Sequence, residues 1–99
     1  MIKVTIKPNE ICVTGHAGYS ERGTDIVCAS VSTAVTMSIN QMELLNVLAN
    51  TKYEVKPGYL KLQVVRTDVV LEKIIENLIY TLSDLESQYP DFIQIKENL

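Results

Sequence analysis

A long stretch without glycine or proline occupies the middle of the sequence. It runs from Asp25 to Asn50, and within it polar side chains recur at spacings of three and four residues, a period typical of a helix. The polar positions are Thr33, Thr36, Asn40, Glu43, Asn46 and Asn50. At about 1.5 Å per residue, a helix over the whole stretch would be roughly 40 Å long. Because its polar stripe is narrow, we expect this central helix to be buried over much of its circumference and to be a candidate for contact with a second subunit.

Segments in which apolar and polar residues alternate lie on both sides of this helix. They are Ile2–Lys7, Ile11–His16, Lys52–Lys56 and Tyr59–Val65. Strict alternation predicts half-buried strands. Pro8-Asn9 joins the first pair and Pro57-Gly58 joins the second, and both dipeptides suit tight turns. The sequence therefore predicts two hairpins, with His16 at the end of the second strand.

A second helix is predicted after Asp68, which can cap it, and it should stop before Tyr89-Pro90. Its apolar stripe is Leu71, Ile74, Ile75, Leu78, Leu82 and Leu85. Phe92–Lys96 then alternates like a last strand. The predicted order is ββαββα-β, an α+β fold in which two helices pack on a mainly antiparallel sheet within a single domain over residues 1–99.

Length and composition narrow the class of protein. The chain has 99 residues, of which 46% are hydrophobic, and its formal charge is −3, which fits one globular domain. No cluster of Lys or Arg occurs, which argues against direct binding of nucleic acid. No run approaches the roughly 18 apolar residues of a membrane span, and the N-terminus alternates instead of forming a signal segment. We therefore expect a cytoplasmic protein with reduced thiols and no membrane partner.

The residue types that carry chemistry gather between Gly15 and Ser32. This stretch holds the only histidine, His16, and one of the two cysteines, Cys28. Between them lies the polar loop Ala17–Thr24, which contains two glycines. We expect this loop to be mobile, since only its tyrosine, Tyr19, can anchor it by burial.

A thiol at the start of a helix, with an imidazole returned beside it, is the minimal equipment for cysteine nucleophilic catalysis. If Asp25 caps the helix, Cys28 is the third helical residue, where the helix dipole favours a thiolate. Asp25 can instead orient His16 as the third member of a triad, and both roles stay open. Ser32 lies one turn after Cys28 and can hydrogen-bond in the site or simply pack. The free N–H groups of the first helical turn are candidates for an oxyanion hole.

Two other interpretations of these residues are possible. Cys28 can be a small buried apolar residue, as many cysteines are. The other interpretation is a zinc site. In a strand, however, Cys12 and His16 would be about 13 Å apart, whereas zinc ligands lie about 2.0–2.3 Å from the metal, so the two residues cannot share one ion unless the strand breaks. A Cys12–Cys28 disulfide is allowed by number, although two cysteines are too few for a disulfide scaffold. We predict no metal and no cofactor.

The run Gly15-His16-Ala17, the run Gly23–Ala29 and the pair Val31-Ser32 together resemble the signature of the ribosomal-processing cysteine protease (Prp) family. The residue types and their spacing match, and no signature position departs from the pattern. The chain length and the predicted order of elements are also similar to that family.

The resemblance implies a homodimeric, cytoplasmic cysteine endopeptidase. Its substrate would be a large-subunit ribosomal protein, from which it removes a short N-terminal extension after a hydrophobic, Phe-containing stretch. By position, His16 is the general base and Cys28 the nucleophile. Asp25 and Ser32 match positions that support the site, and the mobile, substrate-binding loop contributes Gly18, Tyr19 and Gly23. The alternatives are a non-catalytic ribosome-assembly or protein-binding module, or a small zinc-binding domain.

Overall fold

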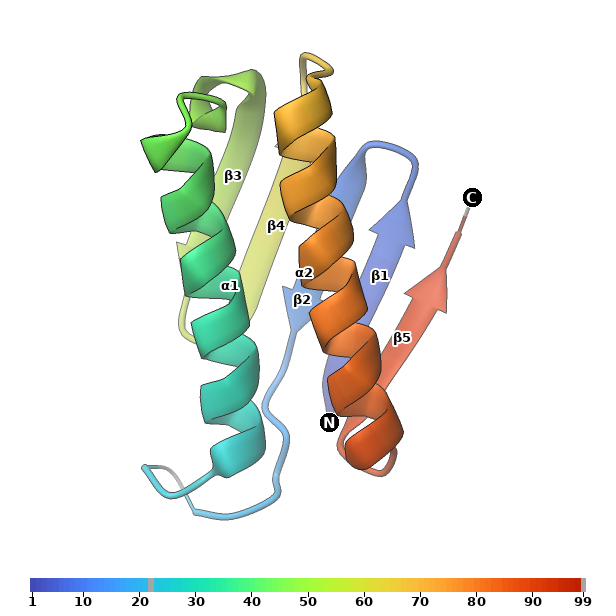
Figure 1. Cartoon of the computed structure of the whole chain (residues 1–99). Helices are drawn as coiled ribbons and strands as arrows, with labels where there is room; N and C mark the ends of the chain where they lie inside the picture. The colour runs from blue at the N-terminus through green and yellow to red at the C-terminus, as the bar shows by residue number, and fades with distance from the viewer. Residues whose placement is uncertain (22, 99) are drawn as a thin grey trace.

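The computed structural model describes residues 1–21 and 23–98. In this part of the chain, two helices lie side by side over one face of a five-stranded sheet with the strand order β3-β4-β2-β1-β5 (Figure 1). The strands are β1 (Ile2–Lys7), β2 (Glu10–Thr14), β3 (Thr51–Lys56), β4 (Tyr59–Val64) and β5 (Ile93–Glu97). The helices are α1 (Ile26–Leu44) and α2 (Val69–Gln88), with a short 3-10 helix, η1 (Leu48–Asn50), before β3.

The pairing of the strands confirms the predicted α+β order and the mainly antiparallel sheet. Every neighbouring pair is antiparallel except β1 and β5, which are parallel. Both hairpins form where they were expected. Because β4 lies antiparallel between β2 and β3, those two strands run parallel, and α1 crosses between them. By the same reasoning α2 crosses between β4 and β5, and both crossovers use the same face (Figure 1).

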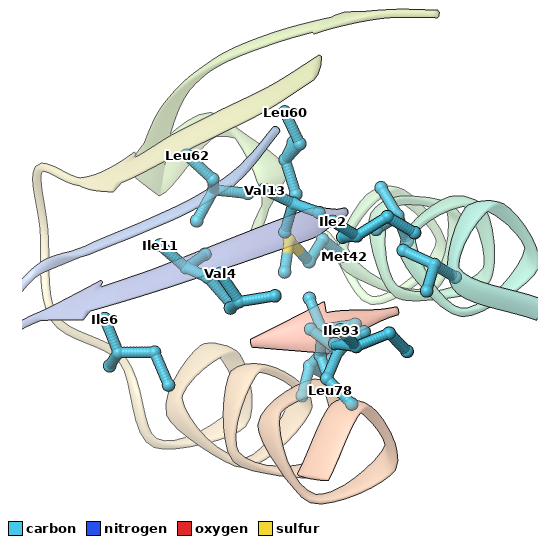
Figure 2. Packing of buried hydrophobic residues seen from close by; sticks show 14 of the residues in the cluster. Ile2, Val4, Ile6, Ile11, Val13, Met42, Leu60, Leu62, Leu78 and Ile93 are labelled. Carbon is cyan, nitrogen blue, oxygen red and sulfur yellow. The ribbon is translucent and has the colours of Figure 1, made fainter. Parts of the chain in front are cut away.

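The core lies between the sheet and the helices. Alternate residues of β1, β2 and β4 point toward the helices and are buried, and α1 and α2 each contribute one row of side chains (Figure 2). Ile2, Ile11 and Leu62 are each at most 2% exposed. Burying an aliphatic side chain of this size stabilises the fold by about 1.5–3 kcal/mol relative to leaving it in water. This core fixes the positions of the elements that carry the site.

The predicted length of the first helix is wrong at its C-terminal end. The helix ends at Leu44, so its 19 residues span about 28 Å. Asn46 adopts a left-handed backbone with φ 60°, which ends the helix. Its N–H donates to the carbonyl of Glu43, and the next N–H, of Val47, donates to the carbonyl of Met42. This is a Schellman end, in which asparagine takes the position that glycine usually fills.

The expectation that this helix is buried on most sides is also wrong for the single chain. One row of α1 faces the core, and it consists of Val27, Val31, Val35, Ser38 and Met42. Apolar side chains elsewhere on the helix face outward: Met37 is 57% exposed and Leu44 is 79% exposed. The polar stripe of this helix is narrow because several apolar side chains lie on its exposed surface.

The second helix and the last strand follow the sequence pattern closely. Asp68 caps α2, its carboxylate accepting from the N–H groups of Val70 and Leu71 at 2.8 and 3.2 Å. The helix ends at Gln88, immediately before Tyr89-Pro90. The last strand begins one residue later than predicted, at Ile93.

One end of the sheet collects the segments that matter for function. The C-terminal end of β2, the start of α1 and the turn between β3 and β4 all lie there, and the connection from α2 to β5 reaches the same end (Figure 1). No helix in the described residues is long and apolar enough to cross a membrane.

Candidate active site

The chain leaves β2 two residues earlier than predicted. The strand ends at Thr14, and Gly15 follows with a left-handed φ of +94°. The Gly15 N–H donates to the carbonyl of Gly58 at 2.9 Å, and a Cβ at Gly15 would lie 2.5 Å from the carbonyl oxygen of Met1. Only glycine fits this bend, so His16 stands beyond the strand and not at its last position.

The imidazole of His16 lies against the β3–β4 turn. Its Cε1 and Nε2 atoms are each 2.9 Å from the point where a Cβ would stand at Gly58. The histidine is exposed, and no hydrogen bond joins its ring to Cys28 in the described part of the chain. The imidazole of His16, the candidate general base, therefore occupies space that is open because Gly58 has no side chain.

Cys28 occupies the predicted place as the third residue of α1. Its side chain is half-buried and its sulfur is a free thiol. The Sγ atom accepts a hydrogen bond from the backbone N–H of Ala17 at 3.2 Å. The loop between base and nucleophile thus touches the nucleophile directly.

Asp25 caps α1 and also holds the loop. Its Oδ1 accepts from the N–H groups of Val27 and Cys28 at 3.0 and 2.9 Å. Its Oδ2 accepts from the N–H groups of Tyr19 and Ser20 at 3.0 and 3.3 Å. These bonds lower the pKa of the Asp25 carboxyl group below its usual value, and the bond from the Cys28 N–H has the largest effect. Desolvation opposes it by a smaller amount, and the other three amides lower the pKa further. Of the two roles left open by the sequence, the cap is the one formed.

The loop Ala17–Thr24 is better held than its composition suggests. Besides the two bonds to Asp25, the hydroxyls of Ser20 and Thr24 lie 2.8 Å apart, and the Thr24 N–H donates to the carbonyl of Glu21 at 3.0 Å. The expectation that only Tyr19 can anchor this loop is therefore wrong. Arg22 lies outside the described residues.

Tyr19 packs away from the other candidate residues. Its ring makes edge-to-face contacts with Tyr89 and Phe92, with centroids 5.7 and 5.1 Å apart. Such pairs typically contribute about 0.5–1.5 kcal/mol beyond burial. Tyr19 thus ties the loop to the α2–β5 connection.

A groove of about 660 Å³ brings the remaining candidates together. The candidate residues that line it are His16, Gly18, Gly23, Asp25, Cys28 and Ser32. Its opposite wall is the segment 55–60, which includes the Pro57-Gly58 turn. Sequence reasoning assigned this segment only a hairpin role. The pairing of β2 with β4 places the turn beside Gly15 and His16, and no local residue pattern signals that pairing.

A second hollow, also of about 660 Å³, lies between the β1–β2 turn and α2. Neither cysteine nor histidine lines it among the described residues. Cys12 lies on β2 opposite Thr5 and Lys61, outside both hollows, and is a free thiol. Burial, followed by the nearby Glu10 carboxylate, raises the pKa of Cys12. The groove that holds both Cys28 and His16 among the described residues is therefore the candidate active site.

Comparison with known proteins shows which family this chain belongs to. The family model described as cysteine protease Prp matches residues 1–94. The chain belongs to the cysteine protease Prp family. It is therefore a cysteine peptidase, and the interpretations as a non-catalytic module or a zinc-binding domain are set aside.

The ribosomal processing cysteine protease Prp of Mycoplasma pneumoniae is 31% identical over 98% of this chain and 95% of its own length. The Staphylococcus aureus protein of the same name is 26% identical over 90% of this chain and 86% of its own length.

Solved structures of the Prp family share the fold. The S. aureus ribosomal processing protease Prp with a covalently linked product peptide superposes with a TM-score of 0.90 at 22% identity, covering 99% of this chain and 100% of that one. The same protease with a substrate peptide gives a TM-score of 0.83 over the same shares, also at 22% identity. At this level of identity the likeness establishes the arrangement of helices and strands.

Proposed function

We propose that this chain removes a short N-terminal extension from a large-subunit ribosomal protein, with Cys28 as nucleophile and His16 as general base. The observation that carries the proposal is that a half-buried thiol at the start of α1 and an exposed imidazole line one groove. The names of the curated relatives, which are ribosomal processing proteases, support the substrate class.

The reaction follows from these two groups. His16 takes the proton of the Cys28 thiol, and the thiolate attacks the scissile carbonyl carbon, forming a C–S bond while the carbonyl electron pair moves to oxygen. The oxyanion collapses, the C–N bond breaks, and the imidazolium gives its proton to the leaving amine. Water, deprotonated by His16, then attacks the thioester. Its C–S bond breaks, the imidazolium returns the proton to sulfur, and the carboxylic acid leaves while the Cys28 thiol is regenerated.

His16 must approach Cys28 for the first step. In the structure its ring rests on the Gly58 turn and makes no hydrogen bond with the sulfur among the described residues. The side chain is exposed, so rotation about its own bonds is unobstructed by a core. Catalytic hydrogen bonds are often long or poorly aligned until substrate closes the site. Peptide binding in the groove is the event that brings base and thiol together.

Ser32 supports the site from the same face of α1. It lies one helical turn after Cys28, lines the groove and is exposed. The hydroxyls of Ser30 and Ser38 donate to backbone carbonyls one turn earlier, whereas within the described residues Ser32 makes no such bond. We assign its hydroxyl to the substrate backbone. Gly18 and Gly23 line the groove at the loop, and Tyr19 acts by holding the loop against α2 and β5.

The whole chain acts as one peptidase domain in the cytoplasm, as a homodimer. The outward-facing side chains Ile26, Met37, Leu44 and Leu45 leave an apolar surface on α1. β3 is an edge strand of the sheet, and its Tyr53 and Val55 are each about half exposed. Apolar surface beside an unpaired strand edge is typical of a face that a second copy covers.

The direct test is incubation with the extended ribosomal protein of the same organism, read by mass spectrometry. The expected products are the shortened protein and the free extension peptide. Cys28→Ala should yield neither, while Cys12→Ser, a matched change at the other thiol, should process normally. Complete processing by Cys28→Ala would remove the nucleophile assignment, and an intact substrate with active wild-type protein would remove the substrate class.

A further inference from the structure

Attack by Cys28 places negative charge on the carbonyl oxygen, and a peptidase needs donors for that charge. The positively charged side chain on the groove wall, Lys56, is already engaged. Its ammonium group lies 3.4 Å from the Glu54 carboxylate and 4.9 Å from the centre of the Tyr59 ring. Within the described residues, backbone N–H groups near the sulfur are the other candidate donors besides the Ser32 hydroxyl, which we have assigned to the substrate backbone.

The first turn of α1 was the sequence-based candidate for the oxyanion hole, but most of its N–H groups are already hydrogen-bonded. The N–H groups of Val27 and Cys28 both donate to Oδ1 of Asp25. The N–H of Ala29 donates to the backbone carbonyl of Asp25 at 3.0 Å. In particular, the amide of the nucleophile itself is committed to the helix cap. The sequence left the N–H groups of this turn as candidates for the oxyanion hole, and in this structure these three are already bonded to Asp25.

The amide of Ala17 has the required direction. It points at Sγ of Cys28 from 3.2 Å, and its residue is 4% exposed, so water does not compete for it. The backbone on both sides is fixed. Gly15 is bonded to Gly58, and the amides of Tyr19 and Ser20 are bonded to Asp25. Fixed N–H donors stabilise developing charge without reorganisation when they lie close to the position that the oxyanion takes, and that position is only two bonds from Sγ.

We propose that the backbone N–H of Ala17 is the oxyanion donor of this peptidase. In the ground state it bonds the sulfur. When the C–S bond forms, the charge leaves sulfur for the carbonyl oxygen, which is separated from Sγ by a single carbon atom. The N–H, which is held close to both atoms, then donates to the oxyanion. Collapse of the oxyanion returns the electron pair to the carbonyl and the N–H to sulfur.

The test removes this N–H alone, by replacing Ala17 with lactic acid so that an ester takes the place of the amide. The background is Cys12→Ser, which leaves Cys28 as the one thiol. Acylation by p-nitrophenyl acetate forms an oxyanion, whereas alkylation by iodoacetamide does not. The matched control is the same replacement at Ala34, a half-buried residue of α1 that packs against the core and does not line the groove. Circular dichroism and the melting temperature verify that each protein is folded.

The expected result is a loss of about 100-fold in acylation for the Ala17 ester, with alkylation within about threefold of the parent protein. The Ala34 ester should change neither rate by more than that. Equal losses in acylation and alkylation would show that the N–H serves the sulfur only and would overturn the proposal, as would unchanged acylation. The proposal rests on the proposed role of Cys28 as nucleophile. Because neither reagent is a ribosomal peptide, its failure is distinct from a failure of the proposed substrate.

A second measurement uses the unmodified protein. The sequence has four alanines, so labelling with 15N-alanine gives four amide signals. N-acetyl-leucinal adds to Cys28 as a hemithioacetal, whose oxygen occupies the oxyanion position. The Ala17 amide proton should move downfield by more than those of Ala29, Ala34 and Ala49. A shift at Ala17 no larger than at Ala49 would overturn the assignment.

Discussion

The ring of His16 lies against the backbone of Gly58, although His16 follows the first hairpin and Gly58 lies in the turn of the second. Because Gly58 has no side chain, the imidazole occupies the space that a Cβ would fill. Gly58 also has a left-handed φ of +69°, so the turn and the histidine require glycine for separate reasons. The turn is therefore part of the active-site groove as well as a connection between strands.

Replacing this glycine should disturb the histidine as well as the turn. Gly58→Ala should destabilise the protein by about 1–3 kcal/mol through left-handed strain alone. The collision with the ring adds to this cost. In a His16→Ala background the strain persists and the collision is absent. A double-mutant cycle by urea unfolding should therefore show a coupling free energy above about 0.5 kcal/mol. Strictly additive free energies would contradict the contact.

Asp25→Asn should separate the two duties of this side chain. An asparagine caps helices about as well as aspartate, so Oδ1 should still accept from Val27 and Cys28. Its amide nitrogen cannot accept from Tyr19 and Ser20. Hydrogen exchange should show faster exchange at these two loop amides and unchanged exchange in α1. Asp25→Ala, the comparison variant, should speed exchange at both places. Equal protection of the loop in wild type and Asp25→Asn would show that the carboxylate does not hold it.

The contribution of Asp25 should depend on pH in a defined direction. Backbone N–H bonds, first that of Cys28, lower its folded pKa below the ordinary value of 3.8. A lowered folded pKa means that the stabilisation is fully present above that ordinary value and is lost as pH falls through the folded pKa. The difference in unfolding free energy between wild type and Asp25→Asn should be constant from pH 5 to 7 and shrink below about pH 4. A difference that grows on acidification would contradict the bonding.

The two thiols should react differently. Burial and the Glu10 carboxylate raise the pKa of Cys12 above its ordinary value of 9.0, against smaller opposing effects of Lys61 and Lys7. The thiolate is the reactive form, so alkylation of Cys12 in a Cys28→Ala protein should be slow at pH 7 and keep rising beyond pH 9. Mass spectrometry of the wild type should show Cys28 modified first. Faster modification of Cys12 would contradict this order.

The apolar surface of α1 should hold the proposed dimer. Leu44→Glu places a charge on its most exposed apolar side chain and should give a monomer in analytical ultracentrifugation at micromolar concentration. The matched control is Val69→Glu at the start of α2, where the parent side chain is 71% exposed. That variant should remain dimeric. A wild type that sediments as a monomer at high concentration would remove the homodimer proposal.

The sequence pattern located nearly every element because the signals are local. Alternation identified the strands, and Asp68 and Pro90 marked the limits of α2. The first helix was extended too far because Asn46 ends it by a backbone conformation that glycine more often signals. The composition of that stretch contains no glycine or proline to mark the end.

The candidate site was predictable in its chemical groups and not in its surroundings. His16, Asp25, Cys28 and Ser32 lie within one short stretch, and a loop–helix pattern brings them together. Gly58 comes from a distant hairpin, and the Tyr19 contacts with Tyr89 and Phe92 cross most of the chain. Those relationships depend on strand pairing and on the path of α2, which residue types alone do not encode.

The contacts of Tyr19 impose an order on the making of the enzyme. Because synthesis proceeds from the N-terminus, the histidine and the cysteine leave the ribosome before Tyr89, Phe92 and β5. Until then β1 lacks its parallel neighbour, and the loop lacks the aromatic rings on which it rests. A nascent chain, or one interrupted before α2 is complete, carries both candidate groups without the aromatic contacts that hold the loop between them. We therefore expect proteolytic activity to require that α2 and β5 have already formed.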